Sequence, residues 1–532
     1  MSKLVLLGDE AIGQGALDAG LSGVYAYPGT PSTEITEYIQ RSKEAREKEL
    51  HAEWSANEKT AMEAGLGMSY AGKRAMVCMK HVGLNVAADA FINAGMTGVN
   101  GGLLVVVADD PSMHSSQNEQ DSRFYGKFAM IPVLEPSTQQ EAYDLSKYGF
   151  DLSEKFKLPV MLRITTRLAH SRSAVEGSGI RTENKLELPT DLTQFILLPN
   201  LSRKKYKLLL STQDSLVFES EESGINRVEN GSDLSKGVIA CGLAYNYYQE
   251  VARQHNLAHP VLKISQYPVS PKLLREFIEK VDEVVVMEEG APIIEESLTG
   301  VLENKYNIKG RLDGTLPRDG ELSPKLIKMA FGFASETIRE VPEIVKNRPP
   351  ALCKGCSHID MYNALNEALG TYAPGRVFSD IGCYTLGALA PYNAINSCVD
   401  MGASIPMAKG AADAGLHPSV AVIGDSTFTH SGMTGLLDVV VENTAVTVII
   451  SDNSTTGMTG GQKSHATNRL VDICKGIGVD AAHIRIIDPL KKHHENNRIM
   501  ITEELDYKGV SVIIAQRECI QTARKKSKVV KS

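Results

Sequence analysis

Apolar runs and amphipathic stretches alternate along the first 170 residues of the chain. The apolar runs have the length and composition of β-strands, and the stretches between them repeat their apolar positions with helical spacing. We expect strands at residues 24–27, 75–79 and 103–108 and helices at residues 32–42 and 84–94. Strands separated by helices pair in parallel and are covered on both faces, so residues 1–170 are predicted to form an α/β domain.

Two further blocks repeat this pattern after a polar segment. Residues 171–235 have mixed charge and weak periodicity, and we interpret them as a connector or a helical insertion. A smaller α/β domain is expected over residues 236–335 and another over residues 345–520. Their expected strands are residues 236–242, 261–264, 283–288, 377–379, 420–423, 446–451 and 510–515. Residues 521–532 are basic, and we expect a mobile tail there.

Composition places the chain among soluble globular proteins of several domains. It has 532 residues, of which 42% are apolar, and a net charge of −8. This charge argues against a nucleic-acid partner, because no basic stripe crosses the body of the chain. No apolar run is long enough to span a bilayer. The apolar stretch at the N-terminus is too short for a signal peptide, so we expect a cytoplasmic protein with no membrane partner.

A glycine and an aspartate follow one expected strand, and an asparagine follows the next. The turn after the first of these strands consists of Gly424, Asp425 and Ser426. A strand-to-helix turn directs backbone N–H groups and the helix dipole toward an anion such as a diphosphate. Neighbouring parallel strands end at the same sheet edge, so Asn453 is expected beside Asp425. We expect both side chains, and a backbone carbonyl near Thr455, to hold Mg²⁺.

This pair of turns resembles the Gly-Asp-Gly and Asn signature of thiamine-diphosphate enzymes. Ser426 stands where the signature has a third glycine, and its side chain is small enough for the same turn. The following glycine-containing loop ends at Gln462, and we expect it to close over the cofactor. The alternative interpretation is an ordinary turn that binds no ligand.

Thiamine diphosphate also needs a carboxylate at its aminopyrimidine ring, normally from a different domain. In this superfamily a Glu opens a helix of small residues, and a strand and a glycine-containing loop follow. Glu58 fits this order and is the expected activating carboxylate, with Glu53 and Glu63 as competitors. The alternative is that all three are solvated charges on a helix face. The loop residues expected at the cofactor are His81, Gly83 and Asn85.

Eight cysteines occur in the chain, and four of them suggest an iron–sulfur cluster. Cys353 and Cys356 lie in one Cys-x-x-Cys loop, and Cys383 and Cys519 each lie at a strand end or loop of the same block. A redox dithiol, half of a zinc site and inert thiols are the alternatives. Zinc is disfavoured because no second close Cys-x-x-Cys or His pair is present. The remaining cysteines are expected to be packed: Cys78, Cys241, Cys398 and Cys474.

With these segments taken together, the chain resembles the large (alpha) subunit of indolepyruvate ferredoxin oxidoreductase, within the 2-oxoacid:ferredoxin oxidoreductases. The resemblance covers nearly the whole chain. Besides the segments above, it rests on Ala26-Tyr27-Pro28-Gly29-Thr30-Pro31-Ser32-Thr33-Glu34, on the residues from Lys80 to Asp89 and on Asp380-Ile381-Gly382-Cys383-Tyr384-Thr385-Leu386-Gly387.

The resemblance implies a multidomain α/β thiamine-diphosphate-binding fold, with a pyrimidine-binding domain, a transketolase-C-terminal-like domain and a diphosphate-binding domain. It implies oxidative decarboxylation of an aryl 2-oxoacid with coenzyme A, and two electrons passed singly to a [4Fe–4S] cluster on the four cysteines. Thr30 matches a residue near the substrate in relatives. Arg123 is a candidate partner for the substrate carboxylate, with a surface salt bridge as the alternative. A smaller beta subunit is implied, as a heterodimer or heterotetramer.

The chain departs from the family in one respect. The large subunit usually continues into a ferredoxin-like domain, and this chain stops at Ser532, where that domain begins. We therefore expect ferredoxin or a separate small iron–sulfur protein to accept the electrons, docking near residues 521–532. The rival functions are a non-oxidative thiamine-diphosphate decarboxylase or carboligase, which needs no cluster, and a non-catalytic electron-transfer or scaffold subunit, which binds no thiamine diphosphate.

Overall fold

The computed structural model describes residues 3–300, 306–334, 342, 344–346 and 350–529. The chain divides into two units, residues 1–339 (unit 1) and residues 340–532 (unit 2). Unit 1 therefore contains the predicted segments 1–170 and 171–235, together with 236–335. Among the described residues, no helix has both the length and the apolar character needed to cross a membrane.

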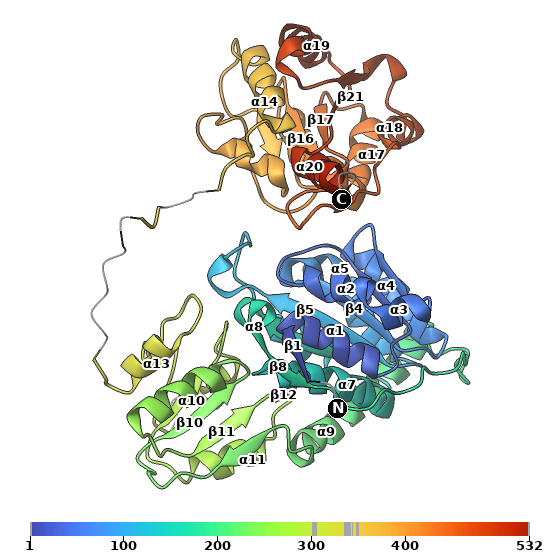
Figure 1. The fold of residues 1–532 in the computed structure, drawn as a ribbon. Helices are drawn as coiled ribbons and strands as arrows, with labels where there is room; N and C mark the ends of the chain where they lie inside the picture. The colour runs from blue at the N-terminus through green and yellow to red at the C-terminus, as the bar shows by residue number, and fades with distance from the viewer. Residues whose placement is uncertain (1–2, 301–305, 335–341, 343, 347–349, 530–532) are drawn as a thin grey trace. The chain divides into compact units, whose positions relative to one another are not determined.

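The larger sheet of unit 1 contains the three strands predicted in the first 170 residues, as β2, β4 and β5, and four more. It has seven strands in the order β12-β6-β7-β5-β4-β2-β3, all parallel to their neighbours except β12. Helices lie between the strands along the chain (Figure 1). The strands are β2 (Gly23–Ala26), β3 (His51–Trp54), β4 (Ala75–Lys80), β5 (Leu103–Asp109), β6 (Val133–Leu134), β7 (Val160–Thr165) and β12 (Gln266–Tyr267). The helices are α1 (Gly8–Asp18), α2 (Thr33–Arg41), α3 (Lys43–Glu47), α4 (Glu58–Tyr70), α5 (His81–Thr97), α6 (Arg123–Ala129), α7 (Gln139–Phe156) and α8 (Thr166–His170).

Successive residues of the central strands pack into different hydrophobic clusters. Met76 and Cys78 of β4 belong to one buried cluster, while Val77 and Met79 belong to another. Side chains alternate between the faces of a sheet, so a strand covered on both faces is apolar at every position. Burial on both faces therefore explains why the sequences of β4 and β5 are nearly continuous apolar runs.

A second sheet in unit 1 contains the strands expected between residues 236 and 335. Its order is β14-β13-β10-β11-β9, and only β9 runs antiparallel to its neighbour. The strands are β9 (Arg227–Glu229), β10 (Gly237–Cys241), β11 (Val261–Ile264), β13 (Val284–Met287) and β14 (Ile308–Lys309), with helices α10 (Ala244–His255), α11 (Pro271–Ile278), α12 (Ile293–Thr299) and α13 (Pro324–Ala330). The segment left open in the sequence contains β8 (Arg172–Glu176), paired with β1 (Lys3–Leu7), and the 24-residue helix α9 (Pro199–Glu222).

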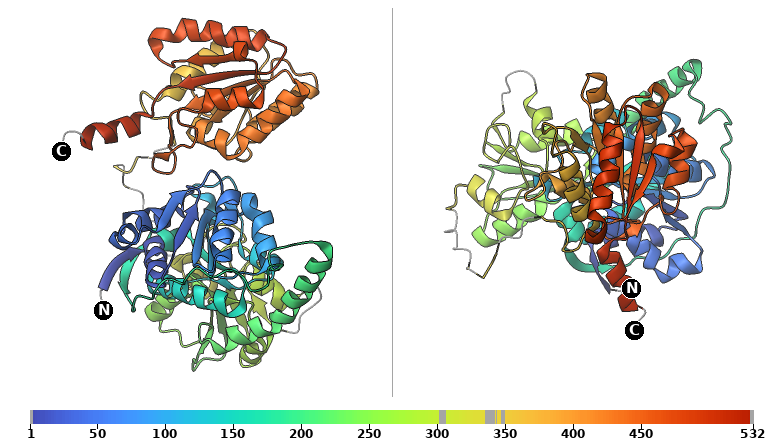
Figure 2. Two further views of the ribbon diagram at one scale, coloured as in Figure 1. Left: turned by 90° about the vertical axis from the view of Figure 1, so that its right-hand side faces the viewer. Right: turned by 90° about the horizontal axis from the view of Figure 1, so that it is seen from above.

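Unit 2 is a five-stranded parallel sheet in the order β15-β16-β17-β21-β20. Val420 and Val422 of β16 face one helix layer, and Ala421 and Ile423 face the other, as Figure 2 shows for the helices on both sides of this sheet. The strands are β15 (Val377–Ser379), β16 (Val420–Gly424), β17 (Thr447–Asp452), β20 (Ile484–Ile487) and β21 (Ser511–Gln516). The helices are α14 (Ser357–Ala368), α15 (Ser404–Asp413), α16 (Asp425–Thr427), α17 (Met433–Glu442), α18 (Leu470–Ile477), α19 (His494–Asp506) and α20 (Ile520–Val529).

Three local expectations differ from the structure. The expected loop from His81 to Asn85 is the first turn of helix α5, because helical apolar spacing begins directly at the end of β4. No helix was predicted in the basic tail, but residues 520–529 form helix α20, whose alanine and lysines favour helix; the mobility of the tail stays a prediction, and residues 530–532 lie outside the described residues. Cys398 is exposed rather than packed, since it lies in a polar loop without regular structure.

Candidate functional site

The predicted activating carboxylate, Glu58, lies at the N-terminus of helix α4 in unit 1. Asn57 caps this helix by accepting a hydrogen bond from the backbone N–H of Thr60 at 2.8 Å. Glu58 is 5% exposed, whereas its predicted competitors Glu53 and Glu63 are exposed. Of the three carboxylates, only Glu58 has the burial expected of a group that acts on a cofactor ring.

The first turn of α5 packs directly against Glu58. A Cβ atom on Gly83 would lie 2.5 Å from Glu58 Oε1 and 2.6 Å from its Cγ, which is closer than unbonded atoms approach. The missing side chain of Gly83 therefore leaves the space that the Glu58 carboxyl group occupies. His81 is buried, and its Nε2 is 3.3 Å from the carbonyl of Asn118.

The other residues predicted for unit 1 have different environments. Asn85 is exposed, and its Oδ1 accepts a hydrogen bond from the hydroxyl of Tyr125 at 2.7 Å. Thr30 is half-buried in the loop between β2 and α2, and its carbonyl accepts a hydrogen bond from Ser115 at 3.3 Å. Both side chains are placed where a ligand could reach them.

Arg123 differs from both interpretations drawn from the sequence. It is 2% exposed, so it forms no surface salt bridge. Its Nη1 donates to Tyr267 at 3.0 Å and to Glu288 at 2.9 Å, and its Nε and Nη2 donate to Asp121. Nη2 also donates to two backbone carbonyls that follow β13. Every N–H group of the guanidinium has an acceptor, so none is left for a substrate carboxylate.

In unit 2, the two predicted turns meet at the carboxyl ends of neighbouring parallel strands. Gly424 at the end of β16 pairs with Ser451 of β17, and Asn453 follows β17 directly. Asp425 is 2% exposed, and its Oδ2 has no hydrogen-bond partner among the described residues. Burial raises the pKa of Asp425 to about 7. This environment favours a neutral acid or a bound cation.

The loop after Asn453 is held by hydrogen bonds from its own residues. Asn453 Oδ1 accepts from the backbone N–H of Thr455 at 3.1 Å. The hydroxyl of Thr455 donates to the carbonyl of Gln462 at 2.9 Å, within the pair β18 (Thr455–Thr456) and β19 (Gln462–Lys463). The hydroxyls of Ser426 and Thr456 lie 2.8 Å apart. The two turns and the loop therefore form one connected group.

Sequence reasoning missed two residues that shape these turns. The ring of Tyr384 lies under the first turn, where a Cβ on Gly424 would come within 2.5 Å of it. Ser464 is buried and hydrogen-bonds to Asp425, which opposes part of the rise in its pKa. Tyr384 belongs to a segment that carries the family resemblance, but no local pattern in the sequence indicates its contact with Gly424.

The four predicted cluster cysteines gather beside the same loop. The pKa of Cys383 is raised to about 12 by burial first and then by the other three thiols, those of Cys356, Cys519 and Cys353. The backbone N–H of Cys519 donates to the carbonyl of Asn453 at 3.1 Å, and a Cβ on Gly457 would lie 3.3 Å from Cys383 Sγ. The three loops that carry the cysteines thus converge on one edge of the sheet. By contrast, Cys78, Cys241 and Cys474 are buried, as predicted.

Comparisons with known proteins identify families that match the two parts of the chain. The family model for the pyruvate flavodoxin/ferredoxin oxidoreductase thiamine-diphosphate-binding domain matches residues 14–196, and that for the C-terminal domain of thiamine pyrophosphate enzymes matches residues 380–514. The chain is 38% identical to the indolepyruvate oxidoreductase subunit IorA of Archaeoglobus fulgidus, over 99% of this chain and 89% of that protein. It is 36% identical to the IorA subunit of Pyrococcus horikoshii, over 97% and 86%.

A solved structure shares the fold. The 2-oxoglutarate:ferredoxin oxidoreductase from Magnetococcus marinus aligns with a TM-score of 0.52 and 17% identity, over 62% of this chain and 65% of that chain. The predicted fold class, α/β with parallel sheets and thiamine-diphosphate-binding domains, is confirmed.

Proposed function

Because the chain belongs to the family of the indolepyruvate oxidoreductase IorA subunits, we propose that it is the thiamine-diphosphate-binding subunit of a 2-oxoacid oxidoreductase. The proposed reaction is oxidative decarboxylation of an aryl 2-oxoacid, such as indolepyruvate, to its acyl-CoA. The observation that carries the proposal is the buried Asp425 carboxylate, whose Oδ2 has no partner among the described residues.

The residues around Asp425 fit a magnesium diphosphate. Carboxylate, amide and backbone oxygens are the ligands that Mg²⁺ prefers, and a cation would relieve the burial that raises the pKa of Asp425. In the proposal, Asp425, Asn453 and the carbonyl of Thr455 hold Mg²⁺. The cofactor's diphosphate lies against the turn and loop residues Gly424, Ser426 and Gln462.

The gathered thiols fit a [4Fe–4S] cluster better than a zinc ion. Two sulfurs on one tetrahedral zinc lie about 3.8 Å apart. In the described parts of the chain, no three of the four sulfurs lie within 4.8 Å of one another. A cubane spreads its four thiolates more widely, so Cys353, Cys356, Cys383 and Cys519 are proposed as its ligands. Such a cluster favours the oxidative reaction over a non-oxidative decarboxylase or carboligase.

When bound, thiamine diphosphate supplies the carbon nucleophile that attacks the 2-oxoacid carbonyl. The chain's own contribution in unit 1 is the Glu58 carboxyl group, proposed to hydrogen-bond the aminopyrimidine ring. His81, Gly83 and Asn85 are proposed to line that part of the cofactor, and Thr30 to lie near the substrate. Arg123 is left out of this set because its donors are all engaged.

The proposed assembly has at least one more kind of subunit. The relatives are named as subunits of an oxidoreductase, which supports the presence of a further subunit. In the proposal this is a smaller beta subunit, in a heterodimer or heterotetramer. Electrons would pass from the cluster to ferredoxin or a separate iron–sulfur protein. Helix α20 is proposed as the surface on which this electron acceptor docks, because its lysine-rich sequence directly follows the cluster ligand Cys519.

The test compares two carboxylates of the same helix in the anaerobically purified enzyme with its copurifying partner. Glu58→Gln should keep bound thiamine diphosphate and about four iron per chain. It should lose about 10²- to 10⁴-fold in 2-oxoacid-dependent, coenzyme-A-dependent dye reduction, the usual loss with a general acid–base group. Glu63→Gln is the matched control, because Glu63 is an exposed residue paired with Lys59, and it should keep full activity.

Two outcomes would contradict the proposal in different ways. Full activity in Glu58→Gln would exclude Glu58 as the activating carboxylate, and loss of activity in Glu63→Gln alone would give that role to Glu63. Thiamine diphosphate without iron in strictly anaerobic protein would exclude the cluster and favour a non-oxidative decarboxylase.

A further inference from the structure

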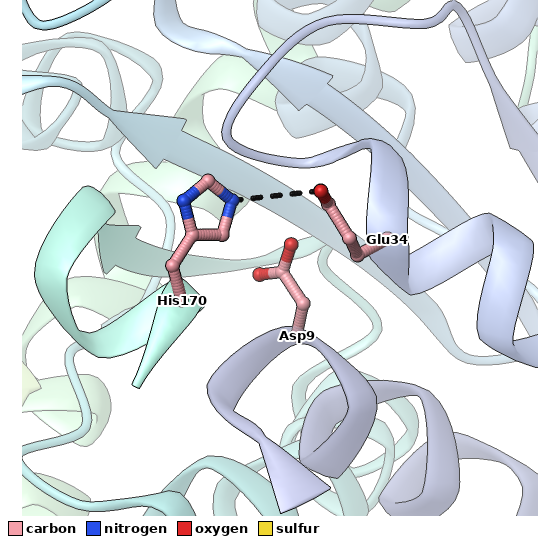
Figure 3. A group of neighbouring side chains, drawn as sticks. All are labelled: Asp9, Glu34 and His170. Atoms are coloured by element: carbon pink, nitrogen blue, oxygen red, sulfur yellow. Dashed lines mark ion pairs between the residues drawn. The ribbon is translucent and has the colours of Figure 1, made fainter. Parts of the chain in front are cut away.

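Three ionisable side chains from distant parts of unit 1 converge on one point. Asp9 comes from helix α1, Glu34 from α2 and His170 from the end of α8 (Figure 3). One ligand atom from each lies within 4.8 Å of those of the other two. His170 Nε2 and Glu34 Oε2 form an ion pair at 3.6 Å. None of the three belongs to the site proposed above.

The carboxylate of Asp9 is the unusual member of this group. Asp9 is fully buried, and neither of its oxygens has a hydrogen-bond partner among the described residues. Glu34 Oε2 also has no hydrogen-bond partner there. Burying a carboxylate without hydrogen-bond partners is unfavourable, so the two Asp9 oxygens, beside the ion-paired and partly exposed Glu34, indicate a ligand that is not a protein donor.

Helix capping does not account for Asp9. Its neighbour Glu10 performs that role, because Glu10 Oε2 accepts a hydrogen bond from the backbone N–H of Leu7 at 2.9 Å. Glu10 also pairs with Arg172 at 3.2 Å. The pKa of Asp9 is raised well above its usual range by burial and by the nearby charges of Glu34 and Glu10. A proton or a cation is needed to make this arrangement favourable.

We propose that Asp9, Glu34 and His170 bind a divalent metal ion of the Zn²⁺ type. Imidazole nitrogen and carboxylate oxygen are both ligands of Zn²⁺ in proteins, and the imidazole favours such an ion over Mg²⁺ or Ca²⁺. Ligand atoms around a tetrahedral ion lie about 3.4 Å apart, so the three must move together by roughly 1 Å. Glu34 and His170 have side chains that are 34% and 35% exposed, which leaves them room to move and gives the ion a path from solvent.

The ion would fix the loop that carries Thr30. Glu34 lies in the first turn of α2, and the loop before it is closed by two hydrogen bonds. Gly29 donates its backbone N–H to the hydroxyl of Thr33 at 3.0 Å, and Ser32 donates its hydroxyl to the carbonyl of Gly29 at 2.7 Å. A metal bond to Glu34 would therefore join this loop to α1 and α8.

Equilibrium dialysis of the purified enzyme against Zn²⁺, with excess Mg²⁺ to fill the diphosphate site, tests the proposal. The cluster must be intact, so that no cysteine is free to bind zinc. The wild-type enzyme should bind about one Zn²⁺ per chain and show a higher melting temperature with it. His170→Gln should weaken binding at least about tenfold, since even residues that only orient a ligand cost about 10- to 100-fold.

His114→Gln is the matched control, because His114 is also a half-exposed histidine paired with a glutamate, Glu321, at 3.5 Å. It should bind zinc as the wild type does. Asp9→Asn is a second test, because it keeps the shape of the side chain and removes its charge. With zinc, this variant should show no rise in melting temperature. Without zinc, it should be at least as stable as the wild type. Equal zinc uptake and equal melting shifts in wild type, His170→Gln and Asp9→Asn would overturn the proposal, leaving a protonated Asp9 as the explanation.

Discussion

At the residue scale, the absence of one side chain positions the proposed activating carboxylate. An alanine Cβ at position 83 would overlap Glu58 Oε1 at 2.5 Å, so Gly83→Ala should push the Glu58 carboxyl group out of place. We expect a fall in dye reduction of about 100-fold, the lower end of the loss of an acid–base group. The measurement is single-substrate kinetics at saturating thiamine diphosphate.

The control for this change is Gly67→Ala in the preceding helix α4, where a Cβ would meet no atom within 4 Å. Replacing an unencumbered helical glycine should stabilise the protein by about 0.5–1 kcal/mol and leave activity unchanged. Equal activity in the two alanine variants would show that the Gly83 contact does not position Glu58.

The residues that sequence could predict are those whose role follows from their place on an element. Asp425 and Asn453 were predicted because parallel strands end at a common edge, and the structure places them on neighbouring turns. The burial of Arg123 and its hydrogen-bond partners were not predictable, because Tyr267 and Glu288 lie more than a hundred residues away in the sequence. The cluster of Asp9, Glu34 and His170 was also missed, because its members come from three separate helices and His170 lies more than a hundred residues from the other two.

At the element scale, the predicted strands are ones whose burial on both faces leaves an apolar run, whereas β3, β7 and β20 were not predicted. The expected strand at residues 261–264 matches β11, and the runs of unit 2 match β15, β16, β17 and β21 within a residue or two. Helix α20 was missed because its basic composition resembles that of a disordered tail. Two side chains of this helix contact other segments of unit 2: Lys525 donates to the carbonyl of Gly460 at 2.9 Å, and Gln521 to Cys353 Sγ at 3.4 Å.

These contacts make the packing of α20 on the Cys353–Cys356 loop testable. Gly355 has φ +84°, and a Cβ there would lie 3.1 Å from Ile520 Cδ1. Gly355→Ala should therefore strain the loop and separate it from α20, and the anaerobically purified protein should retain less iron and sulfide per chain. Gly375→Ala is the control, because Gly375 has φ +95° but faces open space. Both variants should lose about 1–2 kcal/mol of stability from the backbone strain, but only Gly355→Ala should lose iron. Full iron content in both variants would show that the contact between Gly355 and Ile520 does not support the cluster.

At the scale of the whole molecule, each unit has a hydrophobic core of its own. The clusters that contain β4, β5 and β10 lie in unit 1, and those that contain β16 and β17 lie in unit 2. Within unit 1, Arg123 joins the two sheets. It is the first residue of α6, which lies between β5 and β6 of the larger sheet in the chain, and its acceptors include Glu288 and the carbonyls that follow β13 of the second sheet. Buried charges of this kind are costly to leave unpaired.

Arg123→Met should therefore destabilise unit 1 and leave unit 2 largely unaffected. Methionine has a similar length but no charge, so the change leaves Glu288 buried without this cation and Asp121 with Arg163 alone, which should cost about 3–5 kcal/mol. The single tryptophan of the chain, Trp54, lies in β3 of unit 1, so its fluorescence during urea unfolding reports on this unit. Arg181→Met is the control, because Arg181 forms an exposed pair with Asp151 and should cost at most about 1 kcal/mol. If the Trp54 transition of Arg123→Met matches that of Arg181→Met, Arg123 does not hold the two sheets together, and the role of substrate-carboxylate partner would be open to it again.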